Sequence, residues 1–282
     1  MILNETYTLS NGVEIPRLGL GTWFIEDRLA ASAVREAVEI GYRNIDTAQA
    51  YGNERGVGEG IRTSGVPRDE LFVTTKLAAE IKDYEGAVAA IRGSLETLAI
   101  GHIDLMLIHS PQPWSDFRGG DYAEGNREAW RALEEAHRAG MIRAIGVSNF
   151  LQKDLENILE HGSVAPQVNQ VLLHAGNTPT ELLAYCESRG MLVQAYSPIA
   201  HGKLLGRPVI TAIAQKYGAT VPQLCIRYAL QLGAQPLPKT ANPEHMRANT
   251  RLDFEISEAD MEVLRTLDER DERDDEKDGE HR

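Results

Sequence analysis

Residues 103–109 read IDLMLIH and residues 142–148 read IRAIGVS, two short runs that are apolar almost throughout and end in a polar side chain. Runs of this kind are typical of parallel strands that are covered on both faces. We predict eight such strands, separated by helical patterns, near residues 17–21, 43–46, 71–76, 103–109, 142–148, 167–170, 192–196 and 235–239. Because no linker rich in Pro, Gly or Ser interrupts the alternation, the sequence predicts one α/β domain, a (β/α)8 TIM barrel.

Two local patterns add detail to this barrel. Residues 6–9 and 13–15 enclose Asn11-Gly12, which predicts an N-terminal β-hairpin with a type I′ turn. Residues 151–160 have helical periodicity, and their apolar face consists of Leu151, Leu155, Ile158 and Leu159.

Glycine pairs in the sequence do not mark a Rossmann dinucleotide site. Gly19 and Gly21 follow a predicted strand but lack a third glycine, and the glycines at 56, 58 and 60 follow no strand. We interpret them as turn or helix-packing glycines.

Composition narrows the class of protein. The chain has 282 residues, 42% of them hydrophobic and 25% charged, and a formal charge of −13, which argues against a nucleic-acid partner. Its two cysteines, Cys186 and Cys225, form no CxxC pair or cysteine/histidine cluster, so a structural metal is not expected and a reducing compartment fits. With no apolar run of about 18 residues and no signal-peptide pattern, we expect a cytoplasmic protein without a membrane span.

Part of the negative charge is local. Residues 268–282 contain nine acidic and four basic residues and no apolar one, so we expect a charged, disordered tail after a barrel domain over residues 1–267. A role of this tail in binding a partner stays open.

Polar side chains end nearly every predicted strand. Since the carboxyl ends of all barrel strands open on one face, these residues would meet at a single mouth. One polar strand end is usually part of a structural rim, but seven in order indicate an active site: Asp46, Lys76, His109, Ser148 with Asn149, Gln170, Tyr196 and Lys239.

Four residues form a coherent acid–base set. A tyrosine donates a proton well when its pKa, about 10 when free, moves toward the working pH. The Lys76 ammonium would lower the pKa of Tyr51, and Asp46 would hold that ammonium. His109 would orient a substrate carbonyl. Taken singly, each has a structural alternative, as a helix cap (Asp46), a rim residue (Tyr51) or a core histidine (His109).

From about residue 6 to residue 267 the sequence resembles the aldo-keto reductase family, in particular bacterial members of the diketogluconate-reductase-like type. Residues 41–62, GYRNIDTAQAYGNERGVGEGIR, resemble its first signature and carry Asp46 and Tyr51; LFVTTKL places Lys76, and IDLMLIHSP places His109. The later blocks IRAIGVSNF, PQVNQVLLH, LVQAYSPIA and LPKTANPEHMRAN match in order. The resemblance implies a barrel with an N-terminal hairpin and two extra helices.

It also implies reversible, NAD(P)H-dependent reduction of an aldehyde or ketone, without metal or flavin. Hydride would come from the nicotinamide and the proton from Tyr51, with Lys76, Asp46 and His109 as the other catalytic residues. The residues that align with the family's cofactor-binding positions are Gly21, Thr22, Asp46, Ser148, Asn149, Gln170, Tyr196, Ser197, Ile199, His201, Leu204, Lys239, Thr240, Ala241, Asn242, His245 and Asn249.

The sequence departs from the family at the end of the cofactor. Lys239 is present, but an arginine common in NADPH-preferring members is here His245, and a nearby glutamate is Ala248. A mostly neutral imidazole binds a phosphate dianion more weakly than a guanidinium does. We expect NADP(H) to be preferred because Lys239 remains, and NAD(H) use stays open.

For the substrate, the resemblance points to Trp23 and Trp114 beside Tyr51 and His109. The loop over residues 111–125 is long enough to be functional, and its Phe117 and Tyr122 would either wall the pocket or anchor the loop. Arg118 would either recognise a carboxylate or lie at the surface.

We therefore expect a monomeric, cytoplasmic carbonyl reductase acting on a small molecule. One alternative is an NAD-dependent alcohol dehydrogenase, and another is a nucleotide-binding regulatory subunit without turnover. A barrel hydrolase or isomerase with Asp46 as base is disfavoured, because it leaves Lys239 unexplained.

Overall fold

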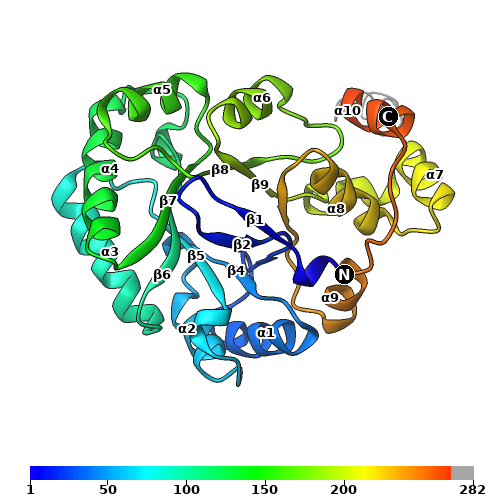
Figure 1. The fold of residues 1–282 in the computed structure, drawn as a ribbon, viewed down its shortest axis with the longest axis horizontal. Coiled ribbons are helices and arrows are strands. Elements are labelled where there is room, and N and C mark those ends of the chain that lie inside the picture. The colour runs from blue at the N-terminus through cyan, green and yellow to red at the C-terminus, as the bar shows by residue number, and fades with distance from the viewer. Residues whose placement is uncertain (268–282) are drawn as a thin grey trace, which may run out of the picture.

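The computed structural model describes residues 1–267, and all eight predicted strands are present in it as one parallel sheet (Figure 1). Strand order follows the chain: β3 (Leu20–Gly21), β4 (Asn44–Asp46), β5 (Phe72–Leu77), β6 (Ile103–Ile108), β7 (Ile142–Ser148), β8 (Val168–Leu172), β9 (Leu192–Tyr196) and β10 (Gln235–Leu237). The sheet closes on itself where Gly21 pairs with Lys239 and the Gly21 amide donates to the Pro238 carbonyl at 3.1 Å. The predicted TIM barrel is confirmed.

Helices surround the barrel and shield the outer faces of its strands. They are α1 (Asp27–Ile40), α2 (Glu54–Arg62), α3 (Tyr84–Leu98), α4 (Ala123–Arg138), α5 (Gln152–His161), α6 (Thr180–Ser188), α8 (Val221–Gln231) and α9 (Pro243–Asn249). Two more, α7 (Pro208–Lys216) and α10 (Glu258–Thr266), lie at the periphery outside the strand–helix alternation, as Figure 1 shows. The expectation of two extra helices is therefore confirmed.

The predicted helix over residues 151–160 is α5, and its apolar face is mostly correct. Leu155 and Ile158 are buried and Leu159 packs against the core, but Leu151 is 44% exposed. Leu151 is the residue before the first helical turn, so its side chain does not share the buried face.

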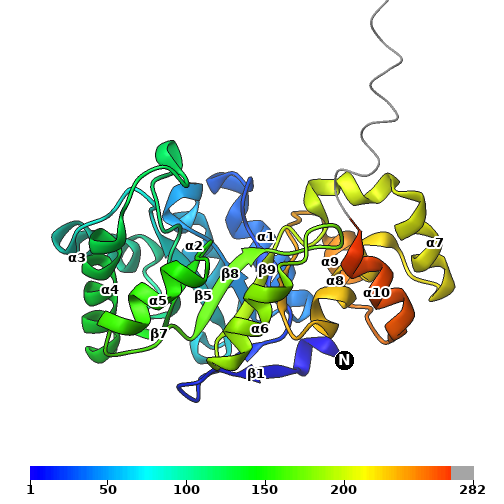
Figure 2. The same ribbon diagram turned by 90° about the horizontal axis from the view of Figure 1, so that it is seen from above.

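The N-terminal hairpin closes the amino end of the barrel. Strands β1 (Thr6–Thr8) and β2 (Glu14–Pro16) pair antiparallel, and Ile15 packs with Leu105 and Val168. Figure 2 shows β1 along one side of the barrel. Because this end is plugged, a site has to form at the opposite, carboxyl end of the strands.

The predicted type I′ turn in this hairpin is wrong. Such a turn needs positive φ at both central residues, whereas in this loop only Gly12 has a positive φ, of +82°. The loop has three residues, closed by a hydrogen bond of 2.9 Å from the Leu9 amide to the Val13 carbonyl. The Asn11 side chain donates to the Arg143 carbonyl at 3.0 Å and accepts a hydrogen bond from the Val13 amide at 3.2 Å.

The glycines at 56, 58 and 60 allow α2 to pack closely against its neighbours. A Cβ atom at Gly58 would lie 2.1 Å from the Leu98 carbonyl oxygen, and one at Gly60 would lie 2.6 Å from Cβ of Val34. These glycines serve helix packing, as predicted. The expected tail over residues 268–282 lies outside the described residues, and the domain boundary at 267 stays a prediction.

Candidate active site

Lys76 lies at the centre of the polar group at the barrel mouth. Its Nζ is 2.6 Å from Oδ1 of Asp46, donates to the Thr47 carbonyl at 2.9 Å, and is 3.2 Å from the Tyr51 hydroxyl. Asp46 ends β4, Lys76 lies in β5, and Tyr51 lies in the 3-10 turn Gln49–Tyr51 that follows β4. The three residues grouped from the sequence are thus brought together.

The Lys76 side chain is fully buried, and an isolated buried ammonium would lose its charge. Burial works to lower its pKa, but the charges of Asp46 and Tyr51 outweigh this effect and raise it. Lys76 is therefore a fixed cation beside the phenol.

The Lys76 ammonium works to lower the pKa of Tyr51, as expected, but the expected net shift toward neutral pH does not occur. Burial raises the pKa of Tyr51, and this effect exceeds the opposing influence of the Lys76 ammonium. The phenol consequently keeps its proton at neutral pH, which is the state that a proton donor requires.

The second oxygen of Asp46 is held from inside the barrel. Nε2 of Gln170 donates to Oδ2 of Asp46 at 2.8 Å and to Oε1 of Gln194 at 2.9 Å, and Gln194 in turn donates to Gln235 at 2.6 Å. Sequence reasoning missed Gln194 and Gln235. Both are polar residues at buried positions of barrel strands, a signal that could have indicated an internal network.

A second polar group lies beside the first. The Tyr196 hydroxyl donates to Oδ1 of Asn149 at 2.9 Å, while Nδ2 of Asn149 donates to Oγ of Ser148 at 3.1 Å and to the His109 carbonyl at 3.0 Å. Asn149 has a φ of +63°, so it turns sharply out of β7. The predicted residues Ser148, Asn149 and Tyr196 are thus joined in one network.

Comparison with known proteins shows which family has this sequence. The family model for the aldo/keto reductase family matches residues 17–269. A glyoxal reductase of Bacillus subtilis is 42% identical over 94% of this chain and 93% of its own length, and a 9,11-endoperoxide prostaglandin H2 reductase of Trypanosoma cruzi is 39% identical over 93% and 91%. The chain belongs to the aldo/keto reductase family.

A solved structure of the same family has the same fold. An aldo-keto reductase of Bombyx mori in complex with NADP superposes with a TM-score of 0.84 at 34% identity, covering 93% of this chain and 92% of that one. As a member of the family, this chain is an NAD(P)H-dependent oxidoreductase that reduces aldehydes or ketones.

Two tryptophans flank the acid–base set of this aldo/keto reductase. The Trp23 ring centroid is 6.4 Å from that of Tyr51, and the Trp114 ring meets the His109 ring edge-on at 5.3 Å. Both are about 40% exposed, and Trp23 stacks on Phe24 at 4.3 Å. Phe117 packs on Trp114 at 5.6 Å. In contrast, the Tyr122 hydroxyl donates to Asp116 at 2.8 Å and closes the loop on itself.

The remaining predicted residues lie in two segments. Ser197 and His201 bond to each other at 3.1 Å in the segment after β9, where Ser197, Ala200 and His201 all have positive φ. The segment after β10 contains Lys239, which pairs with Gly21, followed by Thr240, Ala241, Asn242 and His245. Several predicted contact residues have buried side chains in this structure: Thr22, Leu204 and Asn249 are each at most 5% exposed. Leu204 packs in an apolar cluster rather than facing the mouth.

The donor set fits a nicotinamide nucleotide. Ser148, Asn149 and Gln170 offer amide and hydroxyl groups next to the flat Tyr196 ring, which suits a carboxamide on an aromatic ring. Lys239 with Thr240 and Asn242 suits a phosphate. Among residues 1–267, no three His, Cys, Asp or Glu side chains are grouped as metal ligands, and no helix has the length and hydropathy to cross a membrane.

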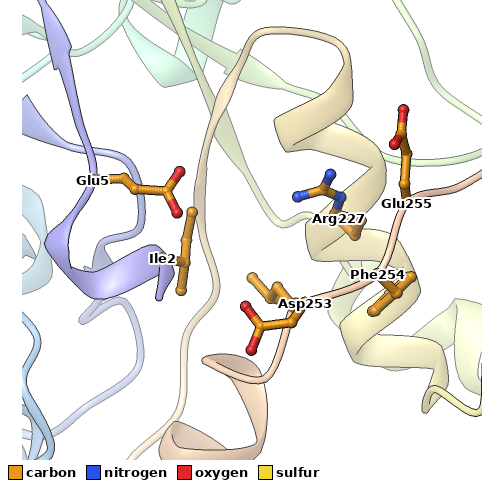
Figure 3. Close-up of a pocket in the computed structure, with 7 residues that line it drawn as sticks. Ile2, Glu5, Arg227, Asp253, Phe254 and Glu255 are labelled. Atoms are coloured by element: carbon orange, nitrogen blue, oxygen red, sulfur yellow. The ribbon is translucent and has the colours of Figure 1, made fainter.

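A cavity of about 300 Å³ lies elsewhere, between the N-terminal segment, α8 and the chain after α9 (Figure 3). Three carboxylates, of Glu5, Asp253 and Glu255, and the single guanidinium of Arg227 line it. The excess of negative charge would repel cofactor phosphates, and no predicted site residue lines it.

His109 is a neutral imidazole near physiological pH. Burial, with the Lys76 and Lys82 charges, lowers its pKa from 6.5 to about 3. An unfolded chain binds a proton at this residue below about pH 6.5, whereas the folded chain does not until about pH 3, so folding stability falls as the pH drops through that window.

We therefore expect His109→Gln to make stability less dependent on pH. Wild type should lose up to about 1.4 kcal/mol more per pH unit below pH 6 than the variant does. Urea unfolding of both proteins at pH 7, 6 and 5 measures this difference. Parallel pH dependences would show that His109 titrates normally in the folded protein.

Proposed function

We propose that this aldo/keto reductase reduces a small-molecule carbonyl compound with NADPH and that Tyr51 protonates the carbonyl oxygen. A bound nicotinamide would supply the hydride. The observation that carries this assignment is the position of the Lys76 ammonium, 2.6 Å from the Asp46 carboxylate and 3.2 Å from the Tyr51 hydroxyl.

In this proposal each residue has a separate task. The Tyr51 hydroxyl gives its proton to the forming alkoxide, and the adjacent Lys76 charge stabilises the phenolate that remains. Asp46 holds Lys76 in place, and Gln170 in turn holds Asp46 by a hydrogen bond. Neutral His109 can donate a hydrogen bond to the substrate oxygen and so orient the carbonyl.

Cofactor binding is assigned to the two networks around the mouth. We assign the carboxamide to Ser148, Asn149 and Gln170, and the nicotinamide face to Tyr196. The segment with Ser197, Ile199, His201 and Leu204 would follow the pyrophosphate; of these, buried Leu204 would act through packing. Lys239, Thr240, Ala241, Asn242, His245 and Asn249 would hold the adenosine end. Preference for NADPH rests on Lys239, and NADH use remains an alternative because of His245 and Ala248.

Replacing His245 with arginine should sharpen this preference. His245 is exposed on α9, and a guanidinium there would add a permanent, bidentate partner for the 2′-phosphate. We expect the Kd of NADPH to fall by about tenfold, an effect of about 1.4 kcal/mol, with little change for NADH. Fluorescence titration with both cofactors measures it. Equal changes for the two cofactors would place His245 away from the phosphate.

We further propose a monomer in the cytoplasm. Both cysteines are unpaired and buried, which suits a reducing compartment. Among the described residues, the exposed large aromatic side chains are Trp23, Phe24, Trp114 and Phe117, which lie at or next to the mouth rather than on a separate face.

Initial rates of NADPH and NADH oxidation test the proposal, with glyoxal, methylglyoxal, phenylglyoxal, benzaldehyde and a simple ketone as substrates. Glyoxal is included because a relative is named a glyoxal reductase. Carbonyl-dependent oxidation that is faster with NADPH is expected. Cofactor binding without turnover of any carbonyl would favour the regulatory subunit, and a clear NADH preference would favour the NAD-dependent dehydrogenase.

A further inference from the structure

The loop between β6 and α4 carries the aromatic side chains next to His109. Its first residues are anchored to neighbouring segments, because Nζ of Lys82 donates to the Ser110 carbonyl and Nδ2 of Asn126 in α4 donates to the Pro111 carbonyl, both at 2.8 Å. Its middle, residues 114–118, contains Trp114 and Phe117, each 43% exposed.

Arg118 ties the middle of this loop to the barrel. One guanidinium nitrogen donates to the Asn149 carbonyl at 2.9 Å, and the other donates to Oδ2 of Asp154 at 3.1 Å. Within the described part of the chain, the other hydrogen bonds of residues 115–121 are local and reach no further than Pro113 and Ala123, the first residue of α4. The backbone of Arg118 has a φ of +65°, a conformation that a non-glycine residue adopts at a cost and keeps when other contacts compensate.

The same guanidinium positions an aromatic ring. Cζ of Arg118 lies 4.8 Å from the Phe117 ring centroid, Phe117 packs on Trp114 at 5.6 Å, and Trp114 meets His109 at 5.3 Å. A row of contacts therefore runs from Arg118 to His109, which orients the substrate carbonyl in the proposed function. Arg118 is already paired with Asp154, so it is not a free cation for a substrate carboxylate.

We propose that Arg118 is a specificity-determining positioning residue, which holds Phe117 and Trp114 as an aromatic wall of the substrate pocket and so favours carbonyl compounds with a flat apolar group next to the carbonyl. This inference rests on the proposed function. Arg118 acts through the wall and not on the cofactor, because the Asn149 side chain has its own partners in Tyr196, Ser148 and the His109 carbonyl.

The kinetic test compares Arg118→Ala with wild type on phenylglyoxal and methylglyoxal, which differ in their apolar group. We expect KM for phenylglyoxal to rise by about fivefold to tenfold, since an aromatic contact contributes about 0.5–1.5 kcal/mol. We expect the KM for methylglyoxal, the kcat for both substrates and the Kd of NADPH each to change by less than about twofold. Arg118→Lys should resemble Arg118→Ala, because a single ammonium cannot reproduce the two bonds that the guanidinium makes, to the Asn149 carbonyl and to Asp154.

Arg127→Ala is the matched control. Like Arg118, Arg127 donates to a side chain of α5, here Asn157 at 2.9 Å, but it does so from α4 and contacts none of the aromatic side chains of the wall. Its replacement should leave both KM values unchanged. Equal changes of KM for the two substrates in Arg118→Ala, or none, would overturn the proposal. If wild type reduced neither carbonyl, the proposed function would fail instead.

A second measurement needs no turnover. Of the three tryptophans, Trp130 is buried, so in a Trp23→Phe background the tryptophan that acrylamide can reach is Trp114. We expect Arg118→Ala to raise its quenching constant and Arg127→Ala to leave it unchanged. An unchanged constant in Arg118→Ala would show that Arg118 does not hold the wall.

Discussion

Replacing Tyr51 with phenylalanine is expected to lower kcat for carbonyl reduction by about 10²–10⁴-fold, the usual contribution of a positioned general acid. The substitution removes only the hydroxyl that lies 3.2 Å from Nζ of Lys76. The ring remains to pack against Lys76 and against His109, at 4.8 and 5.7 Å from its centroid. Steady-state rates of NADPH oxidation, with cofactor Kd from fluorescence, separate the proton step from binding.

The Kd of NADPH should stay within about twofold in Tyr51→Phe, because a loss confined to the transition state lowers kcat and kcat/KM together. Tyr84→Phe is the matched control. It also removes a phenol that bonds to an ionised group, Glu135, but at the α3–α4 contact away from the mouth. A Tyr51→Phe enzyme with near-normal kcat would require another proton donor.

Much of the site follows from the sequence because barrel geometry converts sequence order into spatial proximity. Asp46, Lys76 and His109 stand at or next to the ends of β4, β5 and β6, and neighbouring parallel strands place them side by side. The apolar runs that end in a polar side chain predict those strand ends. Tyr51 could be added because it lies five residues after Asp46, in the short turn that follows β4.

Other features depend on contacts that no local pattern encodes. Asn11 in the hairpin loop donates to the Arg143 carbonyl, 132 positions away in the chain. The pKa of Tyr51 depends on how deeply the folded chain buries the phenol, and burial outweighs the nearby ammonium. Arg118 gains its role only when Asn149 and Asp154 are folded beside it.

Lys76→Met is expected to have the second large effect, on stability as well as on activity. Asp46 is 3% exposed and would lose the cation that lies 2.6 Å from its Oδ1. Removing one partner of a buried ion pair leaves an uncompensated charge and costs about 3–5 kcal/mol of unfolding free energy. Urea unfolding measures this loss, and NADPH oxidation should show that turnover is lost too.

A second substitution shows whether the loss of stability comes from the uncompensated Asp46 charge or from lost packing of the lysine side chain. In the Lys76→Met/Asp46→Asn double variant the orphaned charge is gone, and an amide can still accept the hydrogen bond that Gln170 donates to residue 46. The double variant should recover most of the unfolding free energy but none of the turnover. Arg28→Met, which breaks the solvent-exposed pair with Glu26, should change stability little. If the double variant were as unstable as Lys76→Met, the lysine would matter for its packing, and the charge argument for Lys76, Asp46 and Tyr51 would fail. Recovery of stability without activity would show that the Lys76–Asp46 pair is needed for catalysis, and that the barrel tolerates each of its charges because the other lies 2.6 Å away.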